Sequence, residues 1–91
     1  MTTKKALPKG LKLHKGTQGE TIAQLYNTII VRQLGASYQL NTGSWYTMHT
    51  KKCMNLLLNQ FDIKVSQKAG QWIVTQGNKT IPFVDGMIVT P

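Results

Sequence analysis

The chain has 91 residues, of which eleven are Lys or Arg and only three are Asp or Glu, so its formal net charge is +8 at pH 7. This length fits one domain with a small hydrophobic core. The single Cys excludes an intramolecular disulfide framework. No apolar run approaches the length of a signal-peptide core or a membrane span. We therefore expect a cytosolic protein without a membrane partner.

The positive charge indicates the class of partner rather than the fold. A nucleic-acid phosphate backbone is the commonest complement to a basic surface, because each neutralised phosphate releases a condensed counterion. The same net charge would also allow the protein to bind an acidic protein surface. We therefore expect the partner to be nucleic acid, DNA or RNA, with a protein as the alternative.

The first nineteen residues are basic and contain few apolar side chains. We expect residues 1–19 to form a flexible arm that contacts phosphate groups. The alternation of Leu11 and Leu13 with Lys12 leaves a short edge strand over 9–15 as an alternative. The lysines of this arm are Lys4, Lys5, Lys9, Lys12 and Lys15.

Strand-like composition begins after residue 20. Residues 21–26 and 28–33 are rich in β-branched and aromatic side chains. Asn27 marks either a bulge within one long strand or a break between two. A turn at 34–37 then precedes a short strand at 38–40.

Helical periodicity appears in one segment. Apolar side chains recur there at spacings of three and four residues, which predicts a helix over about 47–60. Either Thr47 or Thr50 can serve as its N-cap, because a threonine hydroxyl accepts a hydrogen bond from a free amide of the first turn. The residues that carry the pattern are Met54, Leu57, Leu58 and Phe61.

Three short strands are predicted after the helix, at 63–67, 72–76 and 80–84. Pro82 cannot donate to a ladder and therefore belongs at a sheet edge or bulge. Asp85-Gly86 predicts a hairpin turn, because both residue types tolerate positive φ. The order β-β-β-α-β-β-β predicts an α+β domain over 20–91. We expect a mainly antiparallel sheet of five or six short strands with the helix packed on one face.

Side chains suited to an anion gather where the helix is expected to begin. A helix N-terminus presents unpaired amides and the positive end of the helix dipole. An aromatic ring beside it can stack on a base. Lysines at even spacing on the next strand share one face and would extend this patch if that face is exposed. The nucleic-acid-binding residues predicted outside the arm are Trp45, Tyr46, Thr47, Thr50, Lys51, Lys52, Lys64 and Lys68.

Structural explanations compete with this site at each position. Threonines commonly cap helices, tryptophans pack in cores, and paired lysines are often only solvated. Trp72 lies among apolar residues and is expected to pack in the core. These alternatives stay open at the level of the sequence.

No residues form a recognisable catalytic or metal centre. His49 and Cys53 are one helical turn apart, but two ligands do not complete a tetrahedral zinc site. We expect Cys53 to be a small buried apolar residue. Three isolated acids supply no general acid–base pair. We therefore expect neither an enzyme nor a cofactor.

Three segments resemble a group of small, mostly uncharacterised proteins of tailed bacteriophages. These are Leu40–Trp45, Thr50–Asn55 and Ile81–Met87. The group's pattern runs approximately L-N-[ST]-G-G-[WY]-x-T-x-T-T-K-x-x-M-N, and later I-P-F-x-D-G-M. Ser44 replaces the second glycine, from which we expect a less strained turn, and His49 replaces a threonine. The resemblance implies a phage origin and expression in the host bacterial cytoplasm, and it implies no activity.

Three functions fit these features. The first is a phage accessory protein that binds nucleic acid through the arm and the helix-entry segment. The alternative is an inhibitor or modulator of a host bacterial protein, such as a nuclease, a polymerase or a defence component. The third is a virion-associated structural domain. Exposed strand edges would also permit a homodimer.

Overall fold

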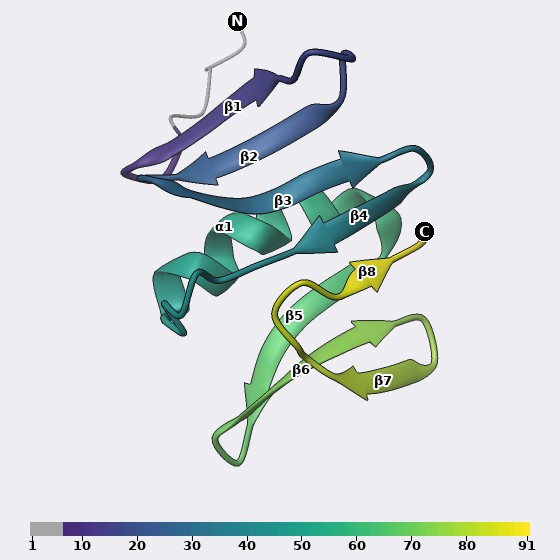
Figure 1. Cartoon of the computed structure of the whole chain (residues 1–91). Coiled ribbons are helices and arrows are strands. Elements are labelled where there is room, and N and C mark those ends of the chain that lie inside the picture. Colours follow the sequence, from purple (N-terminus) through teal and green to yellow (C-terminus); the bar gives the residue numbers. More distant parts are fainter. Residues whose placement is uncertain (1–6) are drawn as a thin grey trace, which may run out of the picture.

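A computed structural model describes residues 7–91, which form two antiparallel sheets and one α-helix (Figure 1). The α+β class and the antiparallel pairing predicted from the sequence are confirmed. The larger sheet has the order β1-β2-β3-β4-β8 and the smaller one the order β5-β6-β7. The elements are β1 (Leu11–Lys15), β2 (Thr21–Leu25), β3 (Thr28–Leu34), β4 (Ser37–Leu40), α1 (Met48–Leu58), a 3₁₀ turn (Asn59–Phe61), β5 (Ile63–Lys68), β6 (Gln71–Gln76), β7 (Lys79–Pro82) and β8 (Ile88–Val89).

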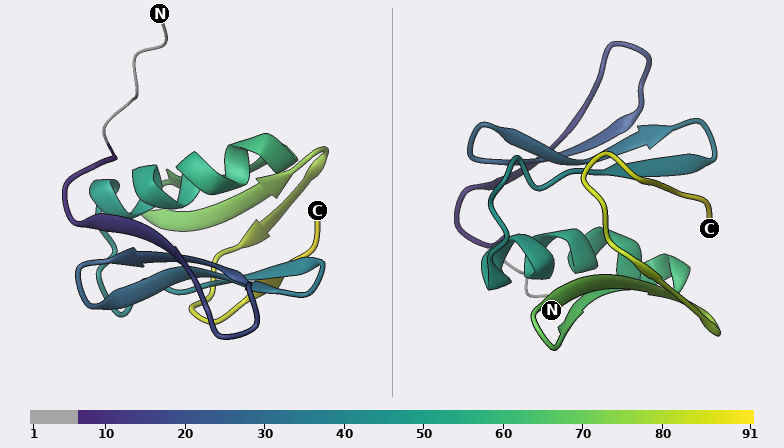
Figure 2. Two further views of the ribbon diagram at one scale, coloured as in Figure 1. Left: turned by 90° about the horizontal axis from the view of Figure 1, so that it is seen from above. Right: turned by 60° about the horizontal axis from the view of Figure 1, so that its bottom comes forward.

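The core lies where α1 packs against both sheets, as the right-hand view of Figure 2 shows. The helix contributes Cys53, Met54 and Leu58, which have no exposed surface. Full burial of a Met or Leu side chain contributes about 1.5–3 kcal/mol through the hydrophobic effect. The smaller sheet contributes Trp72 and Val74, and the burial of Trp72 was expected from its neighbours.

The last strand explains why the domain has two sheets. β8 pairs with β4, so that Val89 lies opposite Tyr38. The turn at Asp85-Gly86 is present, because the amide of Met87 donates to the carbonyl of Val84 over 3.0 Å. The hairpin predicted around it is wrong, since β7 and β8 belong to different sheets. Phe83, before the turn, and Val89, after it, are both buried, at 6% and 4% exposure. Their burial directs the segment before the turn to the smaller sheet and the segment after it to the larger sheet.

The N-terminal segment contains the edge strand that the sequence left as an alternative. β1 pairs with β2 along its whole length, from Leu11 opposite Leu25 to Lys15 opposite Thr21. The expectation of a flexible arm is therefore corrected for Leu11–Lys15, because Leu11 is anchored in the core at 5% exposure. Lys4 and Lys5, also predicted to bind phosphate, lie outside the described residues.

The loop between β4 and α1 contains a strained turn. Gly43 and Ser44 have φ values of 61° and 75°, and the amide of Trp45 donates to the carbonyl of Thr42. Positive φ at both central positions is the feature of a type I′ turn. The expectation that Ser44 relaxes this turn is wrong, because a residue with a Cβ is disfavoured in the left-handed region by about 1–2 kcal/mol.

Replacing Ser44 with Gly is expected to raise the free energy of unfolding by about 0.5–1 kcal/mol. The gain is smaller than the strain, because glycine also increases the entropy of the unfolded chain. Urea denaturation followed by circular dichroism measures it. The matched control is Ser66→Gly, in β5, which is expected to destabilise the protein by a similar amount. A lower midpoint for Ser44→Gly would contradict the strain assigned to this turn.

Candidate functional site

The start of α1 is built by two threonines. Thr47 is the N-cap, and its Oγ1 accepts a hydrogen bond of 3.1 Å from the amide of Thr50. The two hydroxyl oxygens lie 3.0 Å apart and share a hydrogen bond. Thr50 is buried, so both predicted anion-binding hydroxyls also serve to begin the helix. The sequence left Thr47 and Thr50 as alternative caps, and the structure selects Thr47.

Asp85 anchors the loop that leads into the helix. Its Oδ1 accepts from the backbone amide of Thr42 over 2.7 Å, and the Thr42 hydroxyl donates to the same carboxylate over 2.8 Å. The Tyr46 hydroxyl donates to Oδ2 over 3.1 Å. Sequence reasoning assigned Asp85 only to a turn and missed this role. No local signal marks it, because its partners lie about forty positions earlier in the chain.

Tyr46 and Lys51 point toward an aromatic cluster. The ring of Tyr46 meets those of Trp72 and Phe83 edge to face, with centroids 5.1 Å and 6.3 Å apart. The Lys51 ammonium lies 5.3 Å from the centre of a Trp72 ring and donates to Gln67 over 3.2 Å. Both predicted binding residues are therefore engaged by contacts within the protein.

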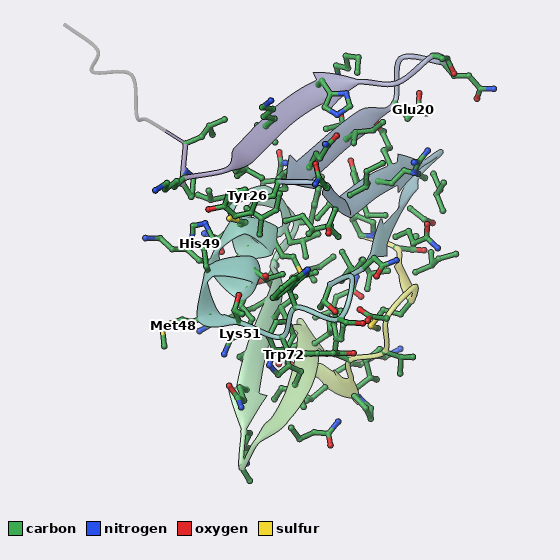
Figure 3. All side chains as sticks on the ribbon, turned by 60° about the vertical axis from the view of Figure 1, so that its left-hand side comes forward. Glu20, Tyr26, Met48, His49, Lys51 and Trp72 are labelled. Atoms are coloured by element: carbon green, nitrogen blue, oxygen red, sulfur yellow. The ribbon has the colours of Figure 1, made fainter. Side chains whose placement is uncertain are left out.

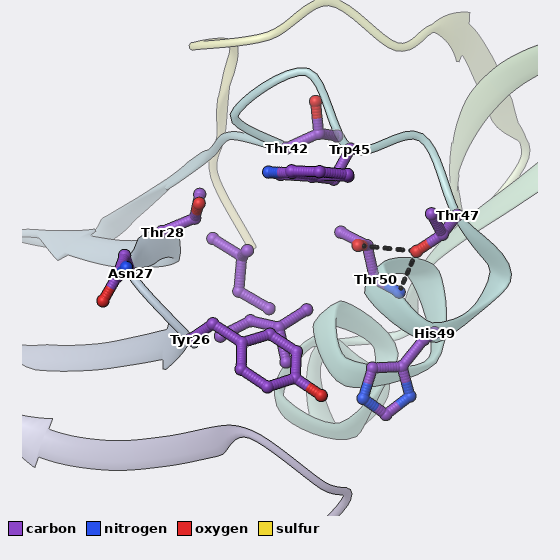
Figure 4. A pocket seen from close by; sticks show the side chains of 10 residues that line it. Tyr26, Asn27, Thr28, Thr42, Trp45, Thr47, His49 and Thr50 are labelled. Atoms are coloured by element: carbon purple, nitrogen blue, oxygen red, sulfur yellow. Dashed lines mark hydrogen bonds between the residues drawn. The ribbon is translucent and has the colours of Figure 1, made fainter.

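A pocket of about 490 Å³ lies between the β2–β3 turn and the start of α1 (Figure 4). Its lining is mainly apolar and includes Leu25 and Ile30 from the sheet. Trp45 closes one side, with 66% of its surface exposed. The pocket therefore adjoins the predicted helix-entry site, and no carboxylate is among its lining residues.

The opposite side of this pocket is formed by a residue that sequence reasoning placed only in a strand. Tyr26 lies in the two-residue turn between β2 and β3, with a φ of 54°. Its ring packs directly on the Cα of Gly10, where an added Cβ would overlap the ring. The Tyr26 amide donates to the Gly10 carbonyl over 2.8 Å, and His49 Nε2 donates to the Lys9 carbonyl over 2.7 Å. These contacts hold the segment before β1 beside the pocket.

Six of the predicted lysines within residues 7–91 are exposed and Lys51 is half-buried, but these lysines do not form one patch around the pocket. Lys9 adjoins the pocket through its backbone, and Lys52 is exposed on α1. Lys64 and Lys68 project from the outer face of the smaller sheet, whereas Val65 between them faces the core. They do not line the pocket. On β1, Lys12 is exposed, and the Lys15 ammonium donates to the Thr21 hydroxyl over 3.0 Å.

Cys53 lies in the core beside the site. Its sulfur is 4.0 Å from His49 Nε2, and the residue has no exposed surface. Burial raises the pKa of the Cys53 thiol above its ordinary value, and the positive charge of Lys52 partly opposes this shift. The thiol therefore stays protonated near neutral pH. Within 7–91, no three His, Cys, Asp or Glu side chains are grouped so that they could hold a metal ion.

The comparisons with known proteins identify a phage family. A family model described as Kyanoviridae Gp96 protein matches residues 11–90. The chain therefore belongs to this family and is a phage protein. No curated protein and no solved structure matches it. None of the helices described in residues 7–91 has the length and apolar character needed to cross a membrane.

Proposed function

We propose that this member of the Kyanoviridae Gp96 family is an accessory protein that binds nucleic acid at its helix entry. The observation that carries the proposal is the apolar pocket beside the exposed Trp45, in a chain whose net charge is +8. Aromatic rings stack on bases, and lysines neutralise phosphates with release of counterions. An apolar, aromatic pocket on a basic protein suits a ligand that combines both groups.

The positions of the three acids support this proposal. Glu20 lies at the far end of the β1–β2 hairpin from Tyr26 and the pocket (Figure 3). Asp62 follows the C-terminal end of α1, whereas the pocket adjoins its N-terminal end. The Asp85 carboxylate is occupied by three hydrogen-bond donors. The pocket therefore has no free carboxylate that would repel a phosphate at the helix entry, and Lys52 is exposed on the same helix.

Fluorescence polarisation with labelled single-stranded and duplex oligonucleotides tests nucleic-acid binding. We expect log K to fall by about 0.7–0.9 per neutralised phosphate and per tenfold rise in salt, measured between about 50 and 200 mM. Lys52→Glu is expected to weaken binding more than Lys79→Glu, which makes the same charge change on β7, away from the pocket. No binding at the lower salt concentration, or equal effects of the two variants, would reject the proposed site.

A second candidate function is binding to a host protein, as an inhibitor or modulator. It is favoured by apolar side chains on the β7–β8 segment: Ile81, Val84 and Ile88 are 46%, 61% and 56% exposed. Large contiguous patches of exposed apolar residues mark protein interaction sites. A pulldown from nuclease-treated host lysate separates the two functions. Retention of one stoichiometric protein favours this candidate, and loss of all partners after nuclease favours nucleic-acid binding.

A further inference from the structure

We infer that the pocket between Trp45 and Tyr26 takes one unpaired nucleobase, so that the protein prefers single-stranded nucleic acid over duplex. The inference rests on the proposed function. It adds that the ligand is single-stranded and that Tyr26 binds it together with Trp45. It starts from the two side chains at opposite sides of the pocket (Figure 4). Trp45 comes from the loop before α1, and Tyr26 from the turn between β2 and β3.

The first argument is exposure. Trp45 is 66% exposed and Tyr26 is 57% exposed, although large aromatic side chains usually bury most of their surface. Tyr46, the neighbour of Trp45, is 53% exposed, but its ring packs on those of Trp72 and Phe83. The core thus has its own aromatic cluster, and the two pocket rings offer their surfaces to a ligand.

The second argument is backbone strain. Tyr26 has a φ of 54° at the first central position of a two-residue hairpin turn, a position where glycine is usual in the type II′ turn. Positive φ is rare for a bulky aromatic residue. Strain of this kind concentrates at ligand-binding sites. Packing on Gly10 and the hydrogen bond to its carbonyl hold the Tyr26 ring beside the pocket despite this strain.

The third argument is the chemistry of the lining. A volume of about 490 Å³ accommodates a ring system, and a mainly apolar lining suits the face of a base better than a phosphate. Polar groups of Asn27, Thr28 and His49 also line the pocket and can meet the edge of a base. A base paired within a duplex presents no free face, so it would have to leave the stack to enter. A single strand presents such bases directly.

The test compares Trp45→Ala and Tyr26→Asn with the wild-type protein. Asparagine tolerates positive φ and therefore preserves the turn. We expect each variant to bind a 15-nucleotide single strand about tenfold to a hundredfold more weakly, while duplex binding changes less than threefold. Trp45→Phe keeps an aromatic ring and is expected to restore most of the affinity. The matched control is Leu56→Ala, which removes an exposed apolar side chain elsewhere on α1.

Three outcomes would overturn the inference. If Trp45→Ala and Tyr26→Asn bind the single strand as tightly as the wild type does, the pocket takes no base. In that case, wild-type binding that still weakens with salt would continue to support the proposed function. If both variants weaken single-strand and duplex binding equally, the rings act on the backbone and not on an unpaired base. If the wild-type protein binds no nucleic acid at low salt, both proposals fail. Circular dichroism of each variant establishes that the fold is retained.

Discussion

Replacing Asn55 with Ala is expected to lower the free energy of unfolding by about 2–4 kcal/mol, a large fraction of the stability of a small domain. Asn55 lies on α1 and bonds the free edge of β5 with both groups of its amide. Its Oδ1 accepts from the Val65 amide over 2.7 Å, and its Nδ2 donates to the Val65 carbonyl over 2.9 Å. The Asn55 side chain thus supplies the two hydrogen bonds that a neighbouring strand would otherwise make to the Val65 backbone. Without it, two backbone groups of a buried residue lose their partners.

Urea denaturation of Asn55→Ala, Asn55→Asp and Asn59→Ala measures this contribution. Aspartate can still accept from the Val65 amide but cannot donate to its carbonyl, so Asn55→Asp should lose less stability than Asn55→Ala. Asn59, exposed at the end of the same helix, is the matched control and should change the midpoint little. Size-exclusion chromatography should also show self-association of Asn55→Ala, because its β5 edge is open. If Asn55→Ala lowers the free energy of unfolding by less than about 0.5 kcal/mol, Asn55 does not close the edge of β5.

Replacing Asp85 with Ala is expected to cost about 2–3 kcal/mol and to weaken single-strand binding. The change removes the acceptor for the amide and the hydroxyl of Thr42, a residue only 1% exposed. It also releases the Tyr46 hydroxyl. Because Thr42 and Tyr46 flank the turn that carries Trp45, the loss of this anchor loosens one wall of the pocket.

Net charge and site geometry predict opposite effects of this substitution on binding. Asp85→Ala raises the net charge from +8 to +9, which by itself strengthens attraction to phosphates. Asp62→Asn makes the same charge change at an exposed position, where its left-handed φ of 59° is tolerated by asparagine. Polarisation titrations should therefore show tighter binding for Asp62→Asn and weaker binding for Asp85→Ala. Equal tightening in both variants would mean that the loop anchored by Asp85 has no part in binding.

The sequence by itself determined the features whose causes lie within a few residues. The apolar spacing from Met54 to Phe61 predicted α1, because that spacing places those side chains on one helical face. The hydroxyl of Thr47 lies within reach of a first-turn amide, so its role as a cap was available locally. Pro82 was correctly assigned to a sheet edge, because a missing N–H excludes a central strand position. The net charge likewise follows from composition alone.

Only the tertiary structure decided which segments meet. The local pattern at Asp85-Gly86 predicted a turn but not that β8 would pair with β4, because strand partners are selected by burial across the whole core. For the same reason, Asp85 could not be assigned to Thr42, 43 positions away. Tyr26 and Trp45 are nineteen positions apart in the sequence, and they share a pocket because the sheet brings the β2–β3 turn to the start of α1. The composition therefore indicated a polyanion, whereas the pocket in which we propose that an unpaired base binds exists only in the folded chain.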